Sequence, residues 1–277
     1  FCRVSFGGFI MKQNLVTKKS MELAGCRSSF ADEKKKLALD TFKSIPMPKE
    51  KDDDWRYTQI DKLKLENFEP FQSKVKISVT SLSEDLIEKG VILTDINTAL
   101  EKFPEARKYF FKNAKIDKDM LVALSAAYFG DGIFLYVPKN IEIDEPIKVR
   151  YNLDGKNSIL HNVVVIEQNS KIDFIEEYSN TEIDKEQLNC CVTEVFANND
   201  SKINFYHVDN WTKNVYNFTN IVGTLDRNAA INWISGCFGG KLNKLRIDTN
   251  FNGQGAQCSN IGIFLGKEKE HIDFTTN

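Results

Sequence analysis

The second half of the chain predicts a β-helix, a solenoid in which short strands stack coil upon coil. A strand pattern recurs near residues 170, 201, 229 and 256, and its aligned positions are 31, 28 and 27 residues apart: Ile172, Ile203, Ile231 and Cys258. A cluster of turn-forming residues precedes each copy, for example at 198–201. Within the first copy Ile172 and Phe174 alternate with Lys171 and Asp173, which puts one face inward and one outward.

Other all-β folds also place strands and turns at regular intervals. A single coil cannot bury its apolar face alone, so neighbouring coils must stack. A β-propeller or a β-sandwich favours tighter hairpins or longer four-strand repeats, whereas aligned isoleucines favour a stacked ladder. The predicted fold class is therefore mainly β, with a β-helix core.

The first half differs and predicts a small α-helical domain with a linker over residues 11–130. A helix is expected over residues 31–44, just before two prolines, because apolar side chains recur there among lysines: Leu37, Leu39 and Phe42. A charged link over 49–54 follows, and then the aromatic cluster Trp55-Arg-Tyr-Thr58. We interpret this cluster as a local anchor that ties the helical segment down.

Local capping signals mark two further helices. Ser81 and Glu84 have the spacing of a capping box, and Gly90 closes the short helix that follows. Pro104 fits the first turn of a helix that runs through Phe111.

The pattern changes from helices to strands near residue 130. Asp117 is expected to open a helix over 120–129, with Gly130 as its stop. Strands are then expected at 133–137, 141–143 and 147–149. The domain boundary is therefore placed near residue 130, and the β-helix core is expected over residues 131–277.

Length, net charge and the distribution of apolar residues limit the classes of function that this protein can have. A chain of 277 residues allows one or two domains and a sizeable core. Its net charge is −2, from 37 basic and 39 acidic residues, which leaves no electrostatic footprint for nucleic acid. No apolar run approaches the roughly 20 residues needed to cross a bilayer, so no membrane role is expected.

The N-terminus shows no clear export signal. Residues 1–10 are mildly apolar but short, and Met11 is the expected natural start, so residues 1–10 are interpreted as a non-native or upstream leader. The six cysteines are then expected to be reduced thiols. The expected compartment is the cytoplasm, or the plastid stroma in a photosynthetic eukaryote.

Two glycine clusters are similar to phosphate-binding loops but lack essential residues. Around residues 236–241, Ser235 stands where the first glycine should be, and Leu242 replaces the hydroxyl residue that would hold magnesium. The run Gly253-Gln-Gly255 begins a dinucleotide pattern that Cys258 interrupts. Both clusters are interpreted as turns between coils.

The cysteines predict no metal cluster, which needs about four converging thiolates. Cys190 and Cys191 are consecutive and would point to opposite faces of a strand. Cys258 occupies the isoleucine ladder and is expected in the core, and Cys237 aligns with Phe264. The remaining two lie apart, Cys2 in the expected leader and Cys26 in an unpatterned segment.

The histidines predict no catalytic or metal site. His161 and His207 stand alone. His271 and Asp273 would share one face of a strand, but no third metal ligand is visible, so pairing at the surface is the favoured interpretation. With no Ser–His–Asp, HExxH or carboxylate pair in the sequence, we predict no catalytic, cofactor-binding or metal-binding residue.

Six short motifs occur in a characteristic order over roughly residues 49–277. They comprise an aromatic motif, a run into the core, two glycine clusters and a last strand: residues 54–58, 132–138, 143–147, 235–240, 253–255 and 271–275. Together they resemble the SufB/SufD family of iron–sulfur cluster assembly proteins. The Trp-Arg-Tyr-Thr motif is more similar to the SufD branch than to the SufB branch.

The resemblance implies an architecture and a role. It implies an N-terminal helical domain, a right-handed parallel β-helix and a C-terminal helical domain. It also implies a scaffold in the SUF iron–sulfur cluster assembly complex, with SufD joined to SufB through their β-helices and each bound by the ATPase SufC. The complex would assemble the iron–sulfur cluster, and no cofactor is expected on this chain alone.

The family pattern continues beyond Asn277, so the chain is expected to be truncated at the C-terminus. The absent part would hold the SufC-docking domain and an interface histidine, for which His271 is no substitute. No functional residue of the family can therefore be assigned here. An uncapped solenoid end predicts poor solubility or self-association.

Three functional hypotheses remain open. The leading one is a non-catalytic scaffold whose edge strands pair with a partner. The alternatives are a polysaccharide-binding or polysaccharide-cleaving β-helix protein and a generic adhesion module, both usually exported. A polysaccharide enzyme would stack charged side chains on one outward face, whereas the aligned outward positions are Lys171, Lys202 and Ala230.

Overall fold

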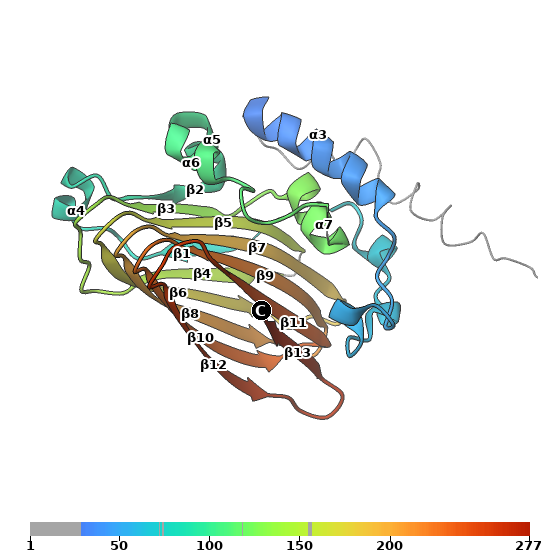
Figure 1. Cartoon of the computed structure of the whole chain (residues 1–277). Coiled ribbons are helices and arrows are strands. Elements are labelled where there is room, and N and C mark those ends of the chain that lie inside the picture. The colour runs from blue at the N-terminus through green and yellow to red at the C-terminus, as the bar shows by residue number, and fades with distance from the viewer. Residues whose placement is uncertain (1–28, 72, 74, 118, 155–156) are drawn as a thin grey trace, which may run out of the picture.

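Two sheets of stacked strands form a parallel β-solenoid (Figure 1). The computed structural model describes residues 29–71, 73, 75–117, 119–154 and 157–277, so the expected leader, Met11, Cys2 and Cys26 lie outside the described residues. The predicted fold class, a mainly β solenoid after a small helical region, is confirmed. Each of five coils contributes one strand to each sheet: β4(Ile147–Leu153) with β5(Ser158–Ile166), β6(Lys171–Asn180) with β7(Gln187–Ala197), β8(Lys202–Trp211) with β9(Val215–Leu225), β10(Ala230–Gly239) with β11(Leu242–Phe251), and β12(Gln257–Leu265) with β13(His271–Thr276).

Strands from the first half of the chain form one end of both sheets, and β12 and β13 form the opposite end. Sheet A has the order β1-β4-β6-β8-β10-β12, and sheet B has the order β13-β11-β9-β7-β5-β3-β2. Strand β1(Lys76–Val79) pairs antiparallel with β4, and β2(Ile92–Asp95) pairs antiparallel with β3(Ile133–Val137). The sequence analysis found β3 but neither β1 nor β2. The division at residue 130 stays a prediction.

The isoleucine ladder lies in register through sheet A. Ile172 pairs with Ile203, Ile203 with Ile231, and Ile231 with Cys258. The isoleucines are at most 1% exposed, whereas Lys171 on the opposite face is exposed. The alternation read from the sequence is therefore confirmed, and it places the ladder inside the solenoid.

The turn clusters hold a column of residues with positive φ, one on each coil. In the described residues the column comprises Asn140, Asn169, Asp200, Asn228 and Gly255, with φ between 55° and 76°. Asparagine, aspartate and glycine adopt this left-handed conformation at the lowest cost. This conformational requirement explains why turn-forming residues precede every repeat.

The described helices lie against the outer face of sheet B, and none of them covers the outer side of sheet A (Figure 1). Helix α7(Met120–Tyr128) packs on β5 and β7, and α3(Ser29–Ser44) packs on α7. The remaining helical segments are short: α4(Glu84–Glu88), α5(Ile96–Lys102), α6(Pro104–Tyr109), η1(Asp53–Trp55), η2(Ile60–Lys62) and η3(Leu65–Phe68). None of the described helices is long and apolar enough to cross a membrane.

Several predicted helix details are corrected. Ser83, rather than Ser81, caps α4, because its hydroxyl accepts a hydrogen bond from the Leu86 amide. Asp119, rather than Asp117, caps α7 through the amides of Leu121 and Val122. One further expectation was wrong, because residues 141–143 form only an isolated bridge at Glu142.

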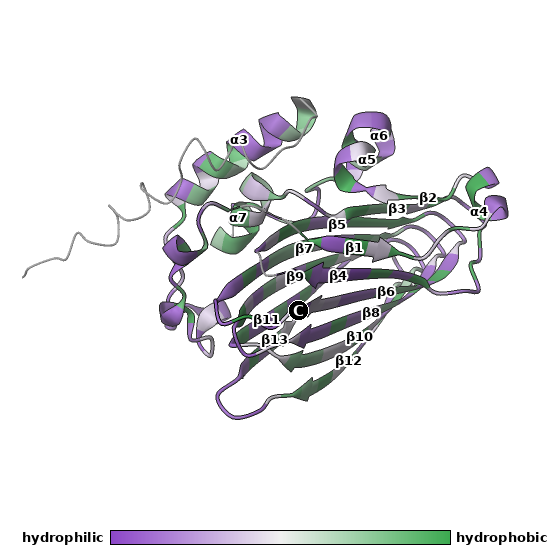
Figure 2. Cartoon of the chain, turned by 180° about the vertical axis from the view of Figure 1, so that it is seen from behind, coloured by the Kyte–Doolittle hydropathy of each residue, from purple (hydrophilic) through white to green (hydrophobic). Residues whose placement is uncertain are grey.

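Two hydrophobic cores result from this arrangement. One fills the solenoid between the sheets and contains the isoleucine ladder. The other lies between sheet B and the helices and contains Leu39 and Phe42 of α3. Strands β5, β7 and β9 are buried on nearly every residue because both of their faces are covered. Apolar residues accordingly concentrate on the strands and on α7 (Figure 2).

Candidate functional site: polar clusters inside and outside the solenoid

A cluster of charged side chains is enclosed in the solenoid beside the apolar ladder. His207 of β8 has its Nδ1 2.7 Å from Oε1 of Glu176 and its Nε2 3.2 Å from Oδ1 of Asp209. All three side chains are at most 1% exposed. Glu176 pairs with His207 in the strand register, so stacking of the coils brings the two residues together.

The charge of His207 follows from these neighbours. Burial alone would lower the pKa of His207, but the carboxylates of Asp209 and Glu176 outweigh burial and raise it to about 10. His207 is therefore an imidazolium at neutral pH. Two hydroxyl groups donate to the second oxygen of Glu176: that of Tyr178, on the same strand, at 3.1 Å, and that of Thr193, on β7, at 3.3 Å.

A ladder of asparagines extends this cluster across sheet B. The Nδ2 of Asn189 donates to Oδ1 of Asn217 at 2.6 Å, and the Nδ2 of Asn217 donates to Oδ1 of Asn243 at 2.7 Å. Asn217 also donates to Oδ2 of Asp209 at 3.0 Å. We call Glu176, His207, Asp209 and the three asparagines the polar column. It gives neighbouring coils a hydrogen-bonded register inside the solenoid.

The aromatic motif after the charged link docks on the outer face of sheet B. The indole of Trp55 is 6% exposed and lies against the ring of Phe218, with 6.2 Å between ring centroids. Lys244 of β11 has its Nζ 4.8 Å from the Trp55 centroid and donates to the Asp54 carbonyl at 2.9 Å and to Oγ1 of Thr58 at 3.0 Å. The motif is an anchor, but these contacts are with the distant solenoid strands rather than the local ones that were predicted.

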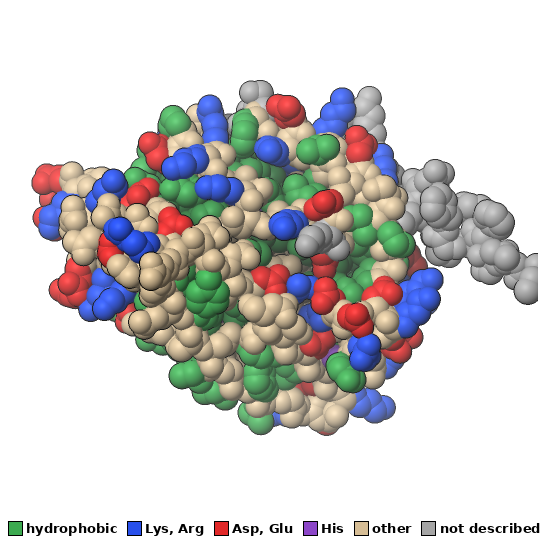
Figure 3. All heavy atoms as spheres, in the orientation of Figure 1, with side chains coloured by type: hydrophobic (Ala, Val, Ile, Leu, Met, Phe, Trp, Pro, Cys, Tyr) green, Lys and Arg blue, Asp and Glu red, His purple; other side chains and the backbone are tan. Residues whose placement is uncertain are grey.

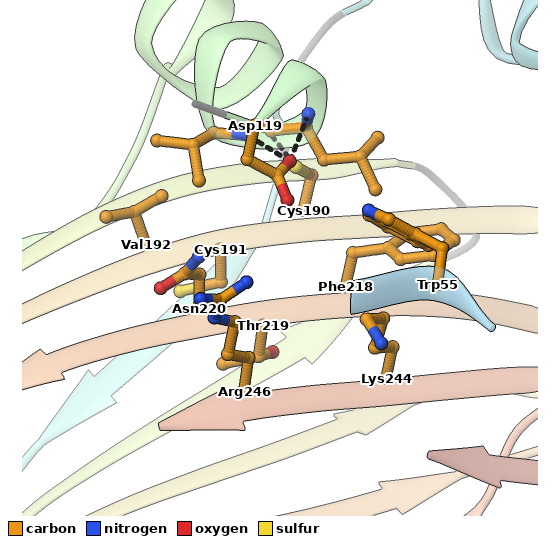
Figure 4. A pocket seen from close by; sticks show the side chains of 12 residues that line it. Trp55, Asp119, Cys190, Cys191, Val192, Phe218, Thr219, Asn220, Lys244 and Arg246 are labelled. Carbon is orange, nitrogen blue, oxygen red and sulfur yellow. Dashed lines mark hydrogen bonds between the residues drawn. The ribbon is translucent and has the colours of Figure 1, made fainter. Parts of the chain in front are cut away.

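A small cavity lies between this anchor and the start of α7 (Figure 4). Asp119 reaches from α7 toward the strands beside Cys190, and Lys244 and Arg246 project from β11 on the other side. The cavity measures about 20 Å³, which is room for one water molecule. Burial raises the pKa of Asp119. The positive charge of Arg246 is already neutralised by Asp54, whose Oδ2 lies 2.7 Å from Nη1 of Arg246.

Comparisons with known proteins match most of the chain. The SufBD protein N-terminal region matches residues 80–149, and the SufBD core domain of the SUF system for iron–sulfur cluster assembly matches residues 149–277. The iron–sulfur cluster assembly protein SufD of Bacillus subtilis is 28% identical over 271 aligned positions, which cover 86% of this chain and 62% of that protein.

The chain belongs to the SufB/SufD family.

Further SufBD family proteins, from Staphylococcus epidermidis and Staphylococcus aureus, are 26% identical over 71% of this chain and 43% of their own length. The chain thus spans less than two thirds of the length of these curated relatives. The family prediction made from the ordered motifs is confirmed. The match to a protein named SufD agrees with the branch that the Trp-Arg-Tyr-Thr motif favours.

In this SufB/SufD chain the described thiols lie apart. Cys190 faces α7 and donates to the Leu121 carbonyl at 3.2 Å, whereas Cys191 faces the interior 3.3 Å from the Tyr178 hydroxyl. Their predicted opposite orientation is confirmed. Cys237 pairs with Phe264 as predicted, and burial raises the pKa of all three thiols: Cys190, Cys191 and Cys237. Cys258 ends the ladder and is half-buried.

The histidines required the largest corrections. His161 is not alone: its Nε2 lies 3.1 Å from Oε2 of Glu194, and both side chains are fully buried under residues 110–114. His271 was expected to pair with Asp273. Instead, Oδ2 of Asp273 lies 2.6 Å from Nζ of Lys244 and accepts a hydrogen bond from the hydroxyl of Thr58. Burial would raise the pKa of Asp273, but those hydrogen bonds outweigh it and lower the value.

Of the two glycine clusters predicted as turns between coils, the one at 253–255 is such a turn, whereas the one at 236–241 forms the end of β10 and the corner to β11 within a single coil. Gly239 and Gly240 have φ of 72° and 97° between β10 and β11, and Gly255 has φ of 76° before β12. A Cβ on Gly239 would lie 2.0 Å from the Trp211 carbonyl oxygen, so only glycine fits. Within the part of the chain that the structure describes, no three His, Cys, Asp or Glu side chains gather as metal ligands.

The polar column escaped the sequence analysis because its members come from different coils. Glu176 and His207 are 31 residues apart (207 − 176), which is the repeat spacing itself. His207 and Asp209 also have the i, i+2 spacing that drew attention to His271 and Asp273. Aligning the coils for polar as well as apolar residues would have found the cluster.

Proposed function

We propose that this chain acts as a scaffold in iron–sulfur cluster assembly by the SUF system. The observation that carries the proposal is the match of the two SufBD family regions over residues 80–277. The named function of the Bacillus relative, iron–sulfur cluster assembly, supports the same conclusion. The chain itself would not be an enzyme, and its expected compartment is the cytoplasm.

The proposed partners are a SufB protein and the ATPase SufC. Strands β12 and β13 end the two sheets, and none of the described strands pairs with their outer edges. Ile261, Ile263 and Leu265 of β12 are 56–58% exposed. The proposal of SufB rests on the family resemblance and not on these edges, because the chain spans only 62% of its Bacillus relative. We propose that SufB joins the solenoid, and that SufC binds a C-terminal domain of the kind that the family resemblance implies.

The buried clusters support a structural role for the solenoid interior. The polar column is fully enclosed, and its hydrogen bonds link strands of neighbouring coils. A rigid platform is what a subunit that works by association requires. The polysaccharide alternative gains no support, because the outward ladder of Lys171, Lys202, Ala230 and Gln257 stacks no carboxylates.

Co-purification tests the proposal. The native full-length protein that contains this chain would be tagged and co-expressed with untagged SufB and SufC from the same source. We expect a stable three-protein complex with ATPase activity. If the folded protein binds neither partner, the scaffold proposal fails and a polysaccharide-binding screen becomes the next experiment.

A further inference from the structure

A groove runs along the corner of the solenoid where the chain passes from sheet A to sheet B. Its volume is about 520 Å³, within the range of small-molecule sites. The walls come from the 59–62 segment and from the turns that end β8, β10 and β12. Five lysines line it: Lys62, Lys213, Lys241, Lys267 and Lys269. We call it the lysine groove.

The charge of the lysine groove contrasts with that of the whole chain. Five lysines and His271 face two carboxylates, Glu268 and Glu270, although the chain as a whole carries a net charge of −2. On the face that Figure 3 shows, basic and acidic side chains are intermixed. Like charges gathered around one concave surface favour an anion there.

Ion pairs neutralise two of the five lysines. Lys213 and Lys241 pair with Glu182 and Glu186, which lie outside the groove lining. Among the described residues, the other three lysines form no ion pair: Lys62, Lys267 and Lys269. All three side chains are exposed, and the ammonium group of Lys62 donates a hydrogen bond to Gln59.

The solenoid spaces the lysines regularly. Trp211 pairs with Gly239, and Lys213 and Lys241 each lie two residues beyond that pair on adjacent coils. Lys269 follows Lys241 by the same 28 residues that separate Lys241 from Lys213 (269 − 241, 241 − 213). Adjacent coils rise by about 4.8 Å, the spacing of neighbouring strands. The groove is therefore a row of closely spaced positive charges.

We propose that the lysine groove binds an oligophosphate, a molecule with two or more linked phosphate groups. Lysine is a common phosphate ligand as a point charge. A terminal phosphate group carries more negative charge than a carboxylate, and linked phosphates offer several negative groups in a row to a row of ammonium groups. The amides of Gln59 and Asn214 add hydrogen-bond donors to the same walls.

Titration calorimetry of the 277-residue chain with inorganic triphosphate tests the proposal. We expect saturable binding that weakens with added salt, and at least tenfold weaker binding by a K62Q/K267Q/K269Q variant. The matched control is K139Q/K171Q/K202Q, which removes three lysines at the opposite corner of the coils, one in a turn and two at the first residues of β6 and β8. That control should bind within twofold of the unmodified chain.

Three outcomes would overturn the proposal. One is the absence of binding at millimolar triphosphate. Another is an equal loss of triphosphate affinity in both lysine variants, because binding would then reflect general charge attraction. The lysines would in that case serve only to keep strand edges from pairing with other chains. The third is citrate binding as tightly as triphosphate, because the groove would then bind anions by charge alone, without a preference for phosphate. A nucleoside triphosphate titrated in parallel tells whether the base adds affinity.

Discussion

His207 is a positive charge held between two carboxylates in a dry interior. Breaking a buried, hydrogen-bonded ion pair from one side leaves an uncompensated charge, which costs far more than a surface pair contributes. Here the loss of His207 would leave both Glu176 and Asp209 without their cation. The residue therefore matters for stability although it faces no solvent.

Replacement of His207 by Gln should lower the free energy of unfolding by about 3–5 kcal/mol. Urea denaturation at pH 7 measures this loss. The E176Q/H207Q double variant should recover part of it, because one buried carboxylate is then neutral. A single variant as stable as the unmodified chain would contradict the ion-pair account.

The same cluster predicts a pH dependence. The pKa of His207 is raised from 6.5 to about 10, so its stabilising contribution is complete below pH 6.5 and is lost as pH rises toward 10. Urea midpoints measured from pH 6.5 to 10 should fall, and should fall less in the E176Q/H207Q variant. Equal slopes for both proteins would show that His207 does not carry the effect.

The thiols differ in accessibility. Cys190, Cys191 and Cys237 are buried with raised pKa values, whereas Cys258 is half-buried at the last coil. In a C2S/C26S variant a thiol reagent should modify Cys258 first and the other three only after unfolding. Mass spectrometry of the native protein checks the order. Fast modification of Cys191 would contradict an enclosed interior.

Among the elements, the turns between coils carry a conformational requirement that strands do not. Asn169 has φ of 58°, and its Nδ2 donates to Oδ1 of Asn140 on the previous coil at 3.0 Å. A β-branched residue is strained in this region of backbone space. The turns thus fix where each coil can begin.

Replacement of Asn169 by Val should cost about 1–3 kcal/mol of stability, while Asn169→Gly should cost clearly less. Thermal or urea unfolding compares the two. Asn210→Val, at an exposed strand position, serves as the control because valine suits a strand. If the two valine variants lose equal stability, backbone strain at the turn is not the cause.

The aromatic anchor holds the linker against sheet B. Removal of the Trp55 indole leaves a cavity over Phe218 and Lys244, so Trp55→Ala should cost about 3–5 kcal/mol. It should also speed tryptic cleavage after Arg56 in the folded protein. Tyr57→Ala is the matched control, because Tyr57 is 79% exposed. Unchanged cleavage in the Trp55 variant would show that the anchor does not hold the linker.

Over the whole molecule, the apolar repeat was predicted, whereas the polar contacts between coils were missed although Glu176 and His207 follow the same repeat spacing. Ile172, Ile203 and Ile231 recur at a near-constant spacing, so the period alone indicates a stacked ladder. Strands β1 and β2 have no repeat of their own, and only tertiary pairing with β4 and β3 defines them. The Lys244–Asp54 contact spans 190 residues, beyond any local pattern.

The most direct test of the scaffold account is hydrogen exchange on the native full-length protein that contains this chain, alone and with SufB added. The account predicts new protection of amides in solenoid strands, with little change in α3 to α7. Protection confined to the helices, or no protection at saturating SufB, would contradict a scaffold that associates through its solenoid.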